Sequence, residues 1–330
     1  MPTSKSPAPK HAMPHDALVK QIYGRPNEAQ DMLRTLLDPQ VLAQLDLNTL
    51  ALESSAYIEP NGTELRSDLL FTVQTQQHRP ALIYVLFEHQ SSQEHRMSLR
   101  ILRYMVDVWM RWESENPKEE YLPPILPVLL SHAAGGWRAP VRFHDLFDPE
   151  LLPILQRYLP SFEFVLDDLV AQSDETLMNR ERSALLRLTD LLLKHARTAD
   201  DLGERWRAWF DMFREAFNAP GGQDAVHYLM RYAVRVSGAL SPDHCQEISQ
   251  EVDRELEVYM ASLAEKWVEE GREEGRRIEM TRSLELMLQL KFREQGGAWA
   301  AQIEAADLAT LERWRARILT VDTIEAVFAE

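Results

Sequence analysis

Residues 81–90 read ALIYVLFEHQ, a continuous apolar run that ends abruptly in Glu88, His89 and Gln90. An apolar run of about seven residues is typical of a central strand that is covered on both faces. Side chains alternate along a strand, so Glu88 and Gln90 share one side and His89 takes the other. The sequence therefore predicts a buried strand that ends in two oxygen-bearing side chains on one face.

A second strand is predicted before it, at residues 65–73, where Asp68 stands among apolar residues. A carboxylate in such a place is costly unless something binds it. The connection between the two strands is short and polar, so they should pair antiparallel, and Asp68 opposes Glu88 directly if the turn is centred on His78. Opposed residues have Cβ atoms about 4.5–5.5 Å apart on one face. That separation suits two carboxylates that hold one cation.

Two carboxylates and the phosphate oxygens of a substrate form a typical site for Mg²⁺, which takes oxygen ligands and keeps several waters. A bound divalent cation lowers the pKa of a water and polarises the phosphoryl group, which is the chemistry of phosphodiester hydrolysis. Spacing alone leaves a second interpretation equally open. In that interpretation Asp68 caps a turn and Glu88 is a solvated strand end.

The rest of the chain alternates helical and strand-like patterns before it becomes wholly helical. Helical spacing covers residues 16–45 and 97–112, and strands are predicted at 50–58, 125–130 and 162–166. From residue 174 onward every segment has helical spacing. The pattern predicts an α/β fold with a mixed sheet flanked by helices and an all-helical C-terminal region. The predicted divisions are a disordered start at 1–14, an α/β domain at 15–172, a helical region at 173–250 and an assembly region at 251–330.

The segment 251–293 is a long helical pattern laced with charge, and Gly271 and Gly275 predict a hinge or fraying point within it. A helix packed on its own domain and a helix that self-associates explain this pattern equally well. A last amphipathic helix is predicted at 303–328. Homo-oligomerisation through these C-terminal helices is therefore one of two open interpretations.

Composition restricts the class of protein. The single cysteine, Cys245, excludes an internal disulfide framework and a cysteine-rich zinc site, which fits a reducing compartment. No signal peptide and no apolar run long enough to cross a bilayer is found, so we expect a cytoplasmic protein without membrane contact. The net charge of −16 argues against a protein that coats nucleic acid nonspecifically, but a metal site needs local carboxylates, so it does not exclude a nuclease.

Several segments taken together resemble the recombination-promoting nuclease family, whose members are also described as YhgA-like transposases, within the PD-(D/E)xK nuclease superfamily. The resemblance covers residues 15 to about 170. The segments that carry it are His15-Asp16 with Lys20, RSDLLF at 66–71, VLFEHQSS at 85–92 and MSLRILRYM at 97–105.

This resemblance implies a restriction-endonuclease-like core and a magnesium-dependent DNA endonuclease linked to recombination or mobile elements. Asp68 matches the metal-binding aspartate of the superfamily, and Glu88 matches its second acidic ligand. Gln90 stands in place of the superfamily's lysine. Glutamine can orient a water but carries no positive charge, so Lys20, Arg100 or a second metal ion must stabilise the transition state.

Other residues are candidates for supporting roles. Arg100 and Arg103 lie three apart on one helix face and could grip phosphates, whereas a salt-bridged surface is the favoured interpretation of Arg111. Glu28 could add a carboxylate to the metal shell, although an ordinary surface glutamate is favoured. Asp167-Asp168 either approaches the site or caps a helix start.

The sequence thus predicts a DNA endonuclease that uses Asp68, Glu88 and Gln90. The main alternative is a catalytically inactive nuclease fold that acts as a scaffold for DNA or protein. A true transposase is a weaker third interpretation, because no dedicated end-binding module such as a helix-turn-helix is recognisable.

Overall fold

The computed structural model describes residues 14–53, 69–88, 94–195, 201–237, 254–292 and 299–328. The chain forms two compact units, Met1–Ile248 and Ser249–Glu330. Each unit has its own hydrophobic core. None of the helices in the described segments combines the length and the apolar character that crossing a bilayer demands.

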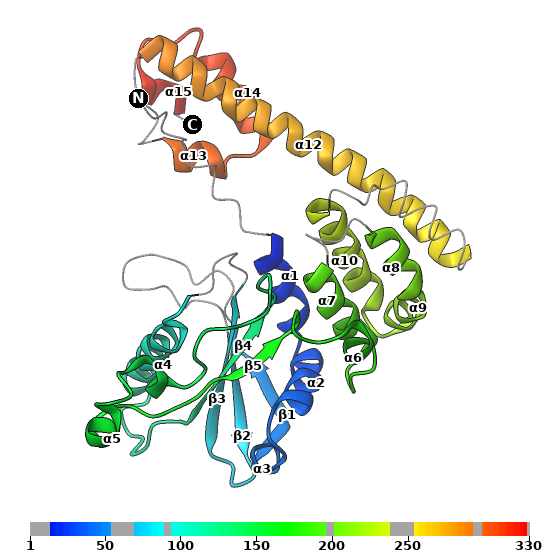
Figure 1. Ribbon diagram of the computed structural model, residues 1–330. Coiled ribbons are helices and arrows are strands. Elements are labelled where there is room, and N and C mark those ends of the chain that lie inside the picture. Colours follow the sequence, from blue (N-terminus) through cyan, green and yellow to red (C-terminus); the bar gives the residue numbers. More distant parts are fainter. Residues whose placement is uncertain are drawn as a thin grey trace. The chain divides into compact units, whose positions relative to one another are not determined.

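A mixed five-stranded sheet lies at the centre of the first unit (Figure 1). Its strands follow one another in sequence order, with β1–β2 and β2–β3 antiparallel and β3–β4 and β4–β5 parallel. The predicted mixed sheet with flanking helices is confirmed. The strands are β1 (Leu45–Leu52), β2 (Leu69–Thr75), β3 (Pro80–Glu88), β4 (Ile125–Ser131) and β5 (Val165–Asp168).

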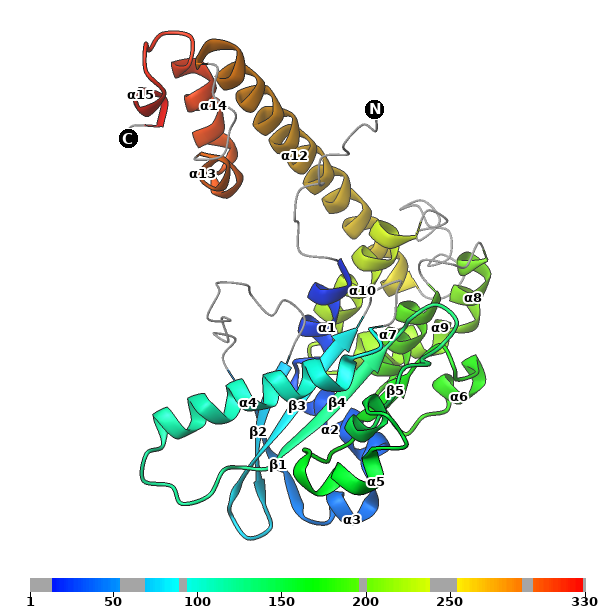
Figure 2. The ribbon, with the colours of Figure 1, turned by 60° about the vertical axis from the view of Figure 1, so that its left-hand side comes forward.

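Helix α4 (Met97–Glu115) covers one face of this sheet, as Figures 1 and 2 show. Its buried residues Met97, Ile101 and Tyr104 recur every three or four positions, so they form one apolar stripe. They pack on Leu70 and Tyr84 of the two central strands. Helix α4 is therefore held against the sheet by the amphipathic spacing that the sequence predicts at 97–112.

The opposite face carries helices α1 (Pro14–Tyr23) and α2 (Pro26–Leu36) (Figure 1). Helix α1 packs against α7 and α10, so the helical segment after the sheet folds into the same unit. The other helices of this unit are α3 (Pro39–Leu42), η1 (Phe143–Leu146), α5 (Leu152–Leu155), η2 (Gln156–Tyr158), α6 (Asp174–Met178), α7 (Ala184–His195), α8 (Leu202–Ala208), α9 (Phe210–Asn218) and α10 (Gly222–Val236).

Two strands differ from their predicted positions. Strand β1 begins at Leu45 rather than at residue 50, because Leu45, Leu47 and Leu50 are buried and the register shifts between Asp46 and Ala51. Strand β5 begins three residues later than predicted. Glu163 forms an isolated antiparallel bridge with Arg142, so this part of the chain pairs outside the sheet before β5 begins.

The second unit consists of α12 (Arg254–Phe292), α13 (Ala300–Ala305), α14 (Leu308–Arg317) and α15 (Ile324–Phe328). Helix α12 runs without a break through Gly271 and Gly275, so the two glycines do not interrupt the helix, and the hinge or fraying point stays a prediction. The single amphipathic helix predicted at 303–328 is wrong, because Asp307 caps a new helix by accepting a hydrogen bond from the amide of Thr310 at 2.7 Å. Met280, Leu284 and Leu288 of α12 pack against these short helices.

Candidate active site

The β2–β3 hairpin carries the predicted catalytic segment. Its pairs run from Leu69 opposite Val85 to Gln74 opposite Pro80, so the hairpin is centred on residue 77 and the predicted centre at His78 is wrong by one residue. His78 adopts a left-handed backbone with φ of 58°, and the amide of Thr75 donates to the carbonyl of Arg79 at 2.8 Å. A three-residue loop that ends in a left-handed residue is a common hairpin connection, and it fixes the register.

Alternation along the two strands separates two faces of the sheet. Leu70, Leu82 and Tyr84 pack with α4, so even-numbered positions of β2 and β3 belong to the face that α4 covers. Glu88, the last residue of β3, belongs to this even-numbered series. The side chain of Glu88 lies outside the described part of the structure, as do Asp68, His89 and Gln90.

Three strands end in one row at the same edge of the sheet. Glu88 is paired with Ser131 across β3–β4, and Ser131 is paired with Asp168 across β4–β5. The carboxyl ends of β3, β4 and β5 lie at this one edge because these strands are parallel, so their last residues Glu88, Ser131 and Asp168 are brought together. Ser131 was missed by the sequence analysis, although it follows the run ILPVLL as Glu88 follows ALIYVLF.

Asp168 uses its carboxylate to hold local backbone. Its Oδ2 accepts from the amide of Trp137 at 2.6 Å, and its Oδ1 accepts from the amides of Val170 and Ala171 at 3.2 and 3.3 Å. A Cβ on Gly136 would stand 3.2 Å from Oδ2, and Gly136 has a φ of 76°. The carboxylate of Asp168 therefore holds the backbone of this loop, and the interpretation in which it caps a helix start is wrong.

Asp167 points away from this edge, into a buried ionic network on the other face. Its Oδ1 accepts from Arg180 at 2.6 Å, and its Oδ2 accepts from Arg182 at 3.0 Å. Asp190 on α7 accepts from the same two arginines at 2.8 Å each and from the hydroxyl of Tyr23 on α1. Burial opposes ionisation of Asp167, but the two guanidinium groups hold its pKa below the ordinary value.

The predicted phosphate-gripping arginines lie at the start of α4. Arg100 donates from Nε to the hydroxyl of Tyr104 at 3.2 Å, and its Nη1 lies 3.4 Å from Oε2 of Glu94. Arg103 is exposed on the same helix. Arg111 forms an ion pair with Glu115 at 2.7 Å, which confirms the salt-bridged interpretation.

Two further candidates lie on the first two helices. Glu28 on α2 accepts a hydrogen bond from the hydroxyl of Ser183, which also caps α7 through the amide of Leu186. Burial raises the pKa of Glu28 from its ordinary value. Lys20 is half-buried on α1, and in the described segments no hydrogen bond or ion pair joins its side chain to the sheet.

Within the described residues, no group of three or more histidine, cysteine, aspartate and glutamate side chains converges to hold a metal ion. At the sheet edge, the carboxylate of Asp168 is already engaged by backbone amides. The chemistry of the predicted donor set fits a hard cation, because Asp68 directly precedes β2, Glu88 ends β3, and both side chains carry oxygen ligands.

A family model described as "Putative transposase, YhgA-like" matches residues 13–222, which include the sheet and most of the helices packed on it. The chain belongs to this family. The matched segment contains the hairpin, α4, and the buried network between Asp167 and Asp190.

Several curated members of the family are recombination-promoting nucleases. The chain is 33% identical to recombination-promoting nuclease RpnD of Escherichia coli O157:H7 over 58% of this chain and 70% of that protein. It is 35% identical to RpnA of E. coli K12 over 58% of this chain and 62% of that protein. An inactive recombination-promoting nuclease-like protein of E. coli K12, RpnE, is 31% identical over 66% of this chain and 70% of its own length. Comparison with the solved structures gave no match.

Proposed function

We propose that this protein is a divalent-metal-dependent DNA endonuclease linked to recombination, with a restriction-endonuclease-like core. Support comes from relatives that are named nucleases and from a mixed sheet whose central hairpin begins at Leu69, directly after Asp68, and ends at Glu88. The register and alternation of β2 and β3 are the observation that carries the proposal.

The register predicts where Asp68 and Glu88 meet. The described ladder ends at Leu69 opposite Val85, so one further pair would put Asp68 opposite Leu86, with Glu88 two residues along on the same face. The two acids would then be diagonal neighbours rather than direct partners, about 7–8 Å apart at Cα and closer at Cβ. Two flexible carboxylates can reach one cation from that separation.

Asp68 and Glu88 would hold the metal ion, and Gln90 continues the same alternating series. When bound, the cation supplies an activated water and polarises the scissile phosphate. The amide of Gln90 would orient that water by hydrogen bonding. Because glutamine carries no charge, Arg100 near the start of α4 is our candidate for stabilising the phosphate charge.

A plasmid-nicking assay with Mg²⁺, with and without chelator, tests this proposal. Asp68→Asn and Glu88→Gln should each abolish nicking and leave the far-ultraviolet circular dichroism unchanged. Asp211→Asn is the matched control, because this substitution also removes one carboxylate, from a side chain on α9 that is 99% exposed. Full cleavage by either active-site variant contradicts the assignment.

A catalytically inactive scaffold is the second candidate, and it is favoured by one observation. The relative RpnE matches this chain over as large a share as the named nucleases do, yet it is called inactive. In that case the purified protein would bind duplex DNA without nicking it in any divalent metal. Chelator-sensitive nicking that Glu88→Gln removes would exclude this candidate.

We further propose that the C-terminal helices mediate self-association. The core of the second unit buries Leu284 and Leu288 of α12, but Leu286 and Leu290 of the same helix are 56% and 72% exposed. Leu286→Glu with Leu290→Glu should shift the mass measured by light scattering toward the monomer. Arg282→Glu is the control for added acidity on α12, and an unchanged mass in the leucine variant contradicts the proposal.

A further inference from the structure

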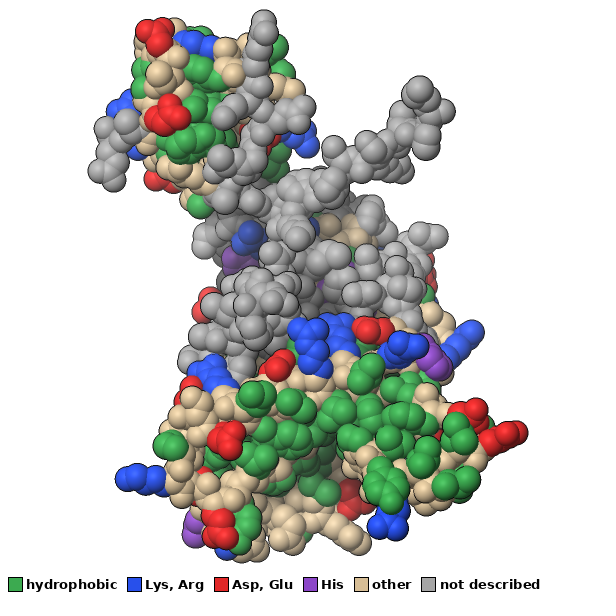
Figure 3. Space-filling model, turned by 90° about the vertical axis from the view of Figure 1, so that its left-hand side faces the viewer, with side chains coloured by type: hydrophobic (Ala, Val, Ile, Leu, Met, Phe, Trp, Pro, Cys, Tyr) green, Lys and Arg blue, Asp and Glu red, His purple; other side chains and the backbone are tan. Residues whose placement is uncertain are grey.

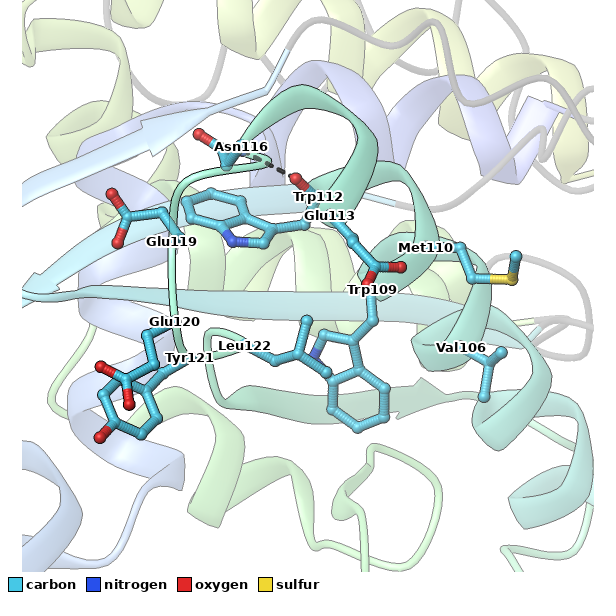
Figure 4. Close-up of a pocket in the computed structure, with 10 residues that line it drawn as sticks. All are labelled: Val106, Trp109, Met110, Trp112, Glu113, Asn116, Glu119, Glu120, Tyr121 and Leu122. Carbon is cyan, nitrogen blue, oxygen red and sulfur yellow. Dashed lines mark hydrogen bonds between the residues drawn. The ribbon is translucent and has the colours of Figure 1, made fainter.

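A pocket lies between the C-terminal half of α4 and the connection that leads into β4 (Figure 4). Its aromatic walls are Trp109, Trp112 and Tyr121. The connection enters β4 at Ile125, whereas β4 ends at Ser131 beside Glu88. The pocket is therefore at the opposite end of the strands from the proposed metal site.

The polar lining of this pocket is acidic. Glu113, Glu119 and Glu120 contribute three exposed carboxylates, and no lysine or arginine lines the pocket. In the described part of the chain, no ion pair or side-chain hydrogen bond engages these three carboxylates. The pocket thus carries an uncompensated negative field.

The two indole groups of the pocket differ in their hydrogen bonding. The Nε1 of Trp109 donates to the carbonyl of Pro123 at 2.8 Å, and Asn116 donates to the carbonyl of Trp112 at 3.0 Å. The Nε1 of Trp112 is shielded from solvent and has no acceptor among the described residues. The indole N–H of Trp109 is therefore already used, and that of Trp112 lies below the surface, so the two indoles contribute apolar and aromatic surface to the pocket.

The rim of the pocket is apolar and accessible. Met110, Tyr121 and Leu122 are 65%, 69% and 54% exposed. Figure 3 shows hydrophobic side chains gathered on this side of the first unit. Contiguous exposed apolar side chains on a protein surface commonly mark an interaction site.

These features select one class of occupant. Indole and phenol rings attract a cation over their faces, and carboxylates attract the same charge. Nucleic acid and anionic membranes would be repelled by the three glutamates. We propose that the pocket binds a basic side chain, arginine or lysine, on an otherwise apolar segment of a partner protein.

Fluorescence anisotropy with a labelled octapeptide of alternating leucine and arginine tests the proposal on the full-length protein. The wild type should bind this peptide with an affinity that falls as salt rises, and the matching leucine–glutamate peptide should not bind. Glu113→Gln with Glu119→Gln and Glu120→Gln should weaken binding about tenfold, since three ionic contacts are lost.

Because any cationic peptide is attracted to an acidic protein, the experiment needs a control variant with the same change in net charge. Glu181→Gln with Glu204→Gln and Glu312→Gln removes three exposed carboxylates that do not line the pocket, and it should bind the peptide as the wild type does. Equal weakening in the two triple variants would overturn the proposal.

A further variant tests the aromatic and apolar part of the pocket. Tyr121→Ala should weaken peptide binding without loss of folding, because Tyr121 is largely exposed. Unchanged affinity in Tyr121→Ala would overturn the proposal.

Discussion

Arg182 and Asp167 form an ion pair in which Nη2 lies 3.0 Å from Oδ2 and both side chains are completely buried. The same guanidinium donates from Nε to the hydroxyl of Thr35 on α2 at 2.6 Å. With Asp190 and Tyr23, this network joins β5, α7, α2 and α1. The sheet and the helices that follow it are therefore connected by buried ion pairs and hydrogen bonds between side chains.

Removal of Arg182 should destabilise the protein strongly. Arg182→Ala leaves Asp167 and Asp190 buried near each other, and breaking one partner of a buried pair costs about 3–5 kcal/mol. The free energy of unfolding from urea titration measures this loss. Arg34→Ala is the control, since Arg34 pairs with Asp31 at the surface and should cost at most about 1 kcal/mol. Equal losses in the two variants would show that the buried network contributes no special stability.

Asp174 should give the protein a measurable acid sensitivity. Burial opposes ionisation of Asp174, but hydrogen bonds from Lys194 and His195 more than offset this and hold its pKa below the ordinary value. A carboxyl with a lowered folded pKa stabilises the protein above its unfolded pKa of about 3.9 and loses that contribution as pH falls through the folded value.

Asp174→Asn should therefore be less stable than the wild type at neutral pH, and the difference should shrink as pH falls below about 4. Urea unfolding at several pH values measures that difference. The control is Asp211→Asn, whose exposed side chain makes only a 3.7 Å surface contact with Arg214. A difference that stays constant down to acid pH would refute the role of Asp174.

Glu28 should contribute to stability rather than to cleavage. It accepts a hydrogen bond from Ser183, whose hydroxyl also caps α7. Glu28→Gln should keep any nicking activity that the wild type has, while Ser183→Ala should lower the free energy of unfolding by about 1 kcal/mol. A Glu28→Gln protein that folds normally but no longer nicks DNA would contradict this prediction and would support Glu28 as part of the metal shell.

Arg100 and Arg111 offer a matched pair on one helix. Arg100→Ala should weaken DNA affinity and reduce the slope of log affinity against log salt by about one, as expected for one phosphate contact. Arg111→Ala should leave both quantities unchanged, because Arg111 lies near the other end of α4 and forms a closer ion pair, 2.7 Å from Glu115. Anisotropy titrations of a labelled duplex at several salt concentrations distinguish the variants. An unchanged slope in Arg100→Ala would remove Arg100 from the DNA contact.

Strong local patterns predicted some elements closely. Strand β3 spans Pro80–Glu88 against a predicted 81–87, and α4 begins at the predicted Met97. Continuous apolar runs and amphipathic stripes are local signals, so one segment is enough to read them. The centre of the β2–β3 hairpin was wrong by one residue, because turn type depends on which residue takes the left-handed backbone. His78 adopts the left-handed backbone here, and its side chain does not predict this conformation.

The candidate site was only partly predictable. The register of the β2–β3 hairpin does not favour the predicted direct opposition of Asp68 and Glu88. That the two carboxylates share one cation stays a prediction, since Asp68, Gln90 and the Glu88 side chain lie outside the described residues. Sequence reasoning left two roles open for Glu28 and for Asp167-Asp168. The structure assigns partners to all three residues, and some of these partners, such as Ser183 for Glu28 and Trp137 for Asp168, are distant along the chain.

The amino-acid sequence by itself determined the buried strand, the polar residues at its end, the amphipathic helix after it and the resemblance to a nuclease family. Tertiary structure alone decided that Asp167 enters an ionic network while its neighbour Asp168 holds the loop at Trp137. Alternation along a strand sends adjacent side chains to opposite faces, and it is local. What each face offers comes from other segments, such as the turn that carries Arg180 and Arg182 and the loop at Trp137, so the partners appear only when the chain is folded.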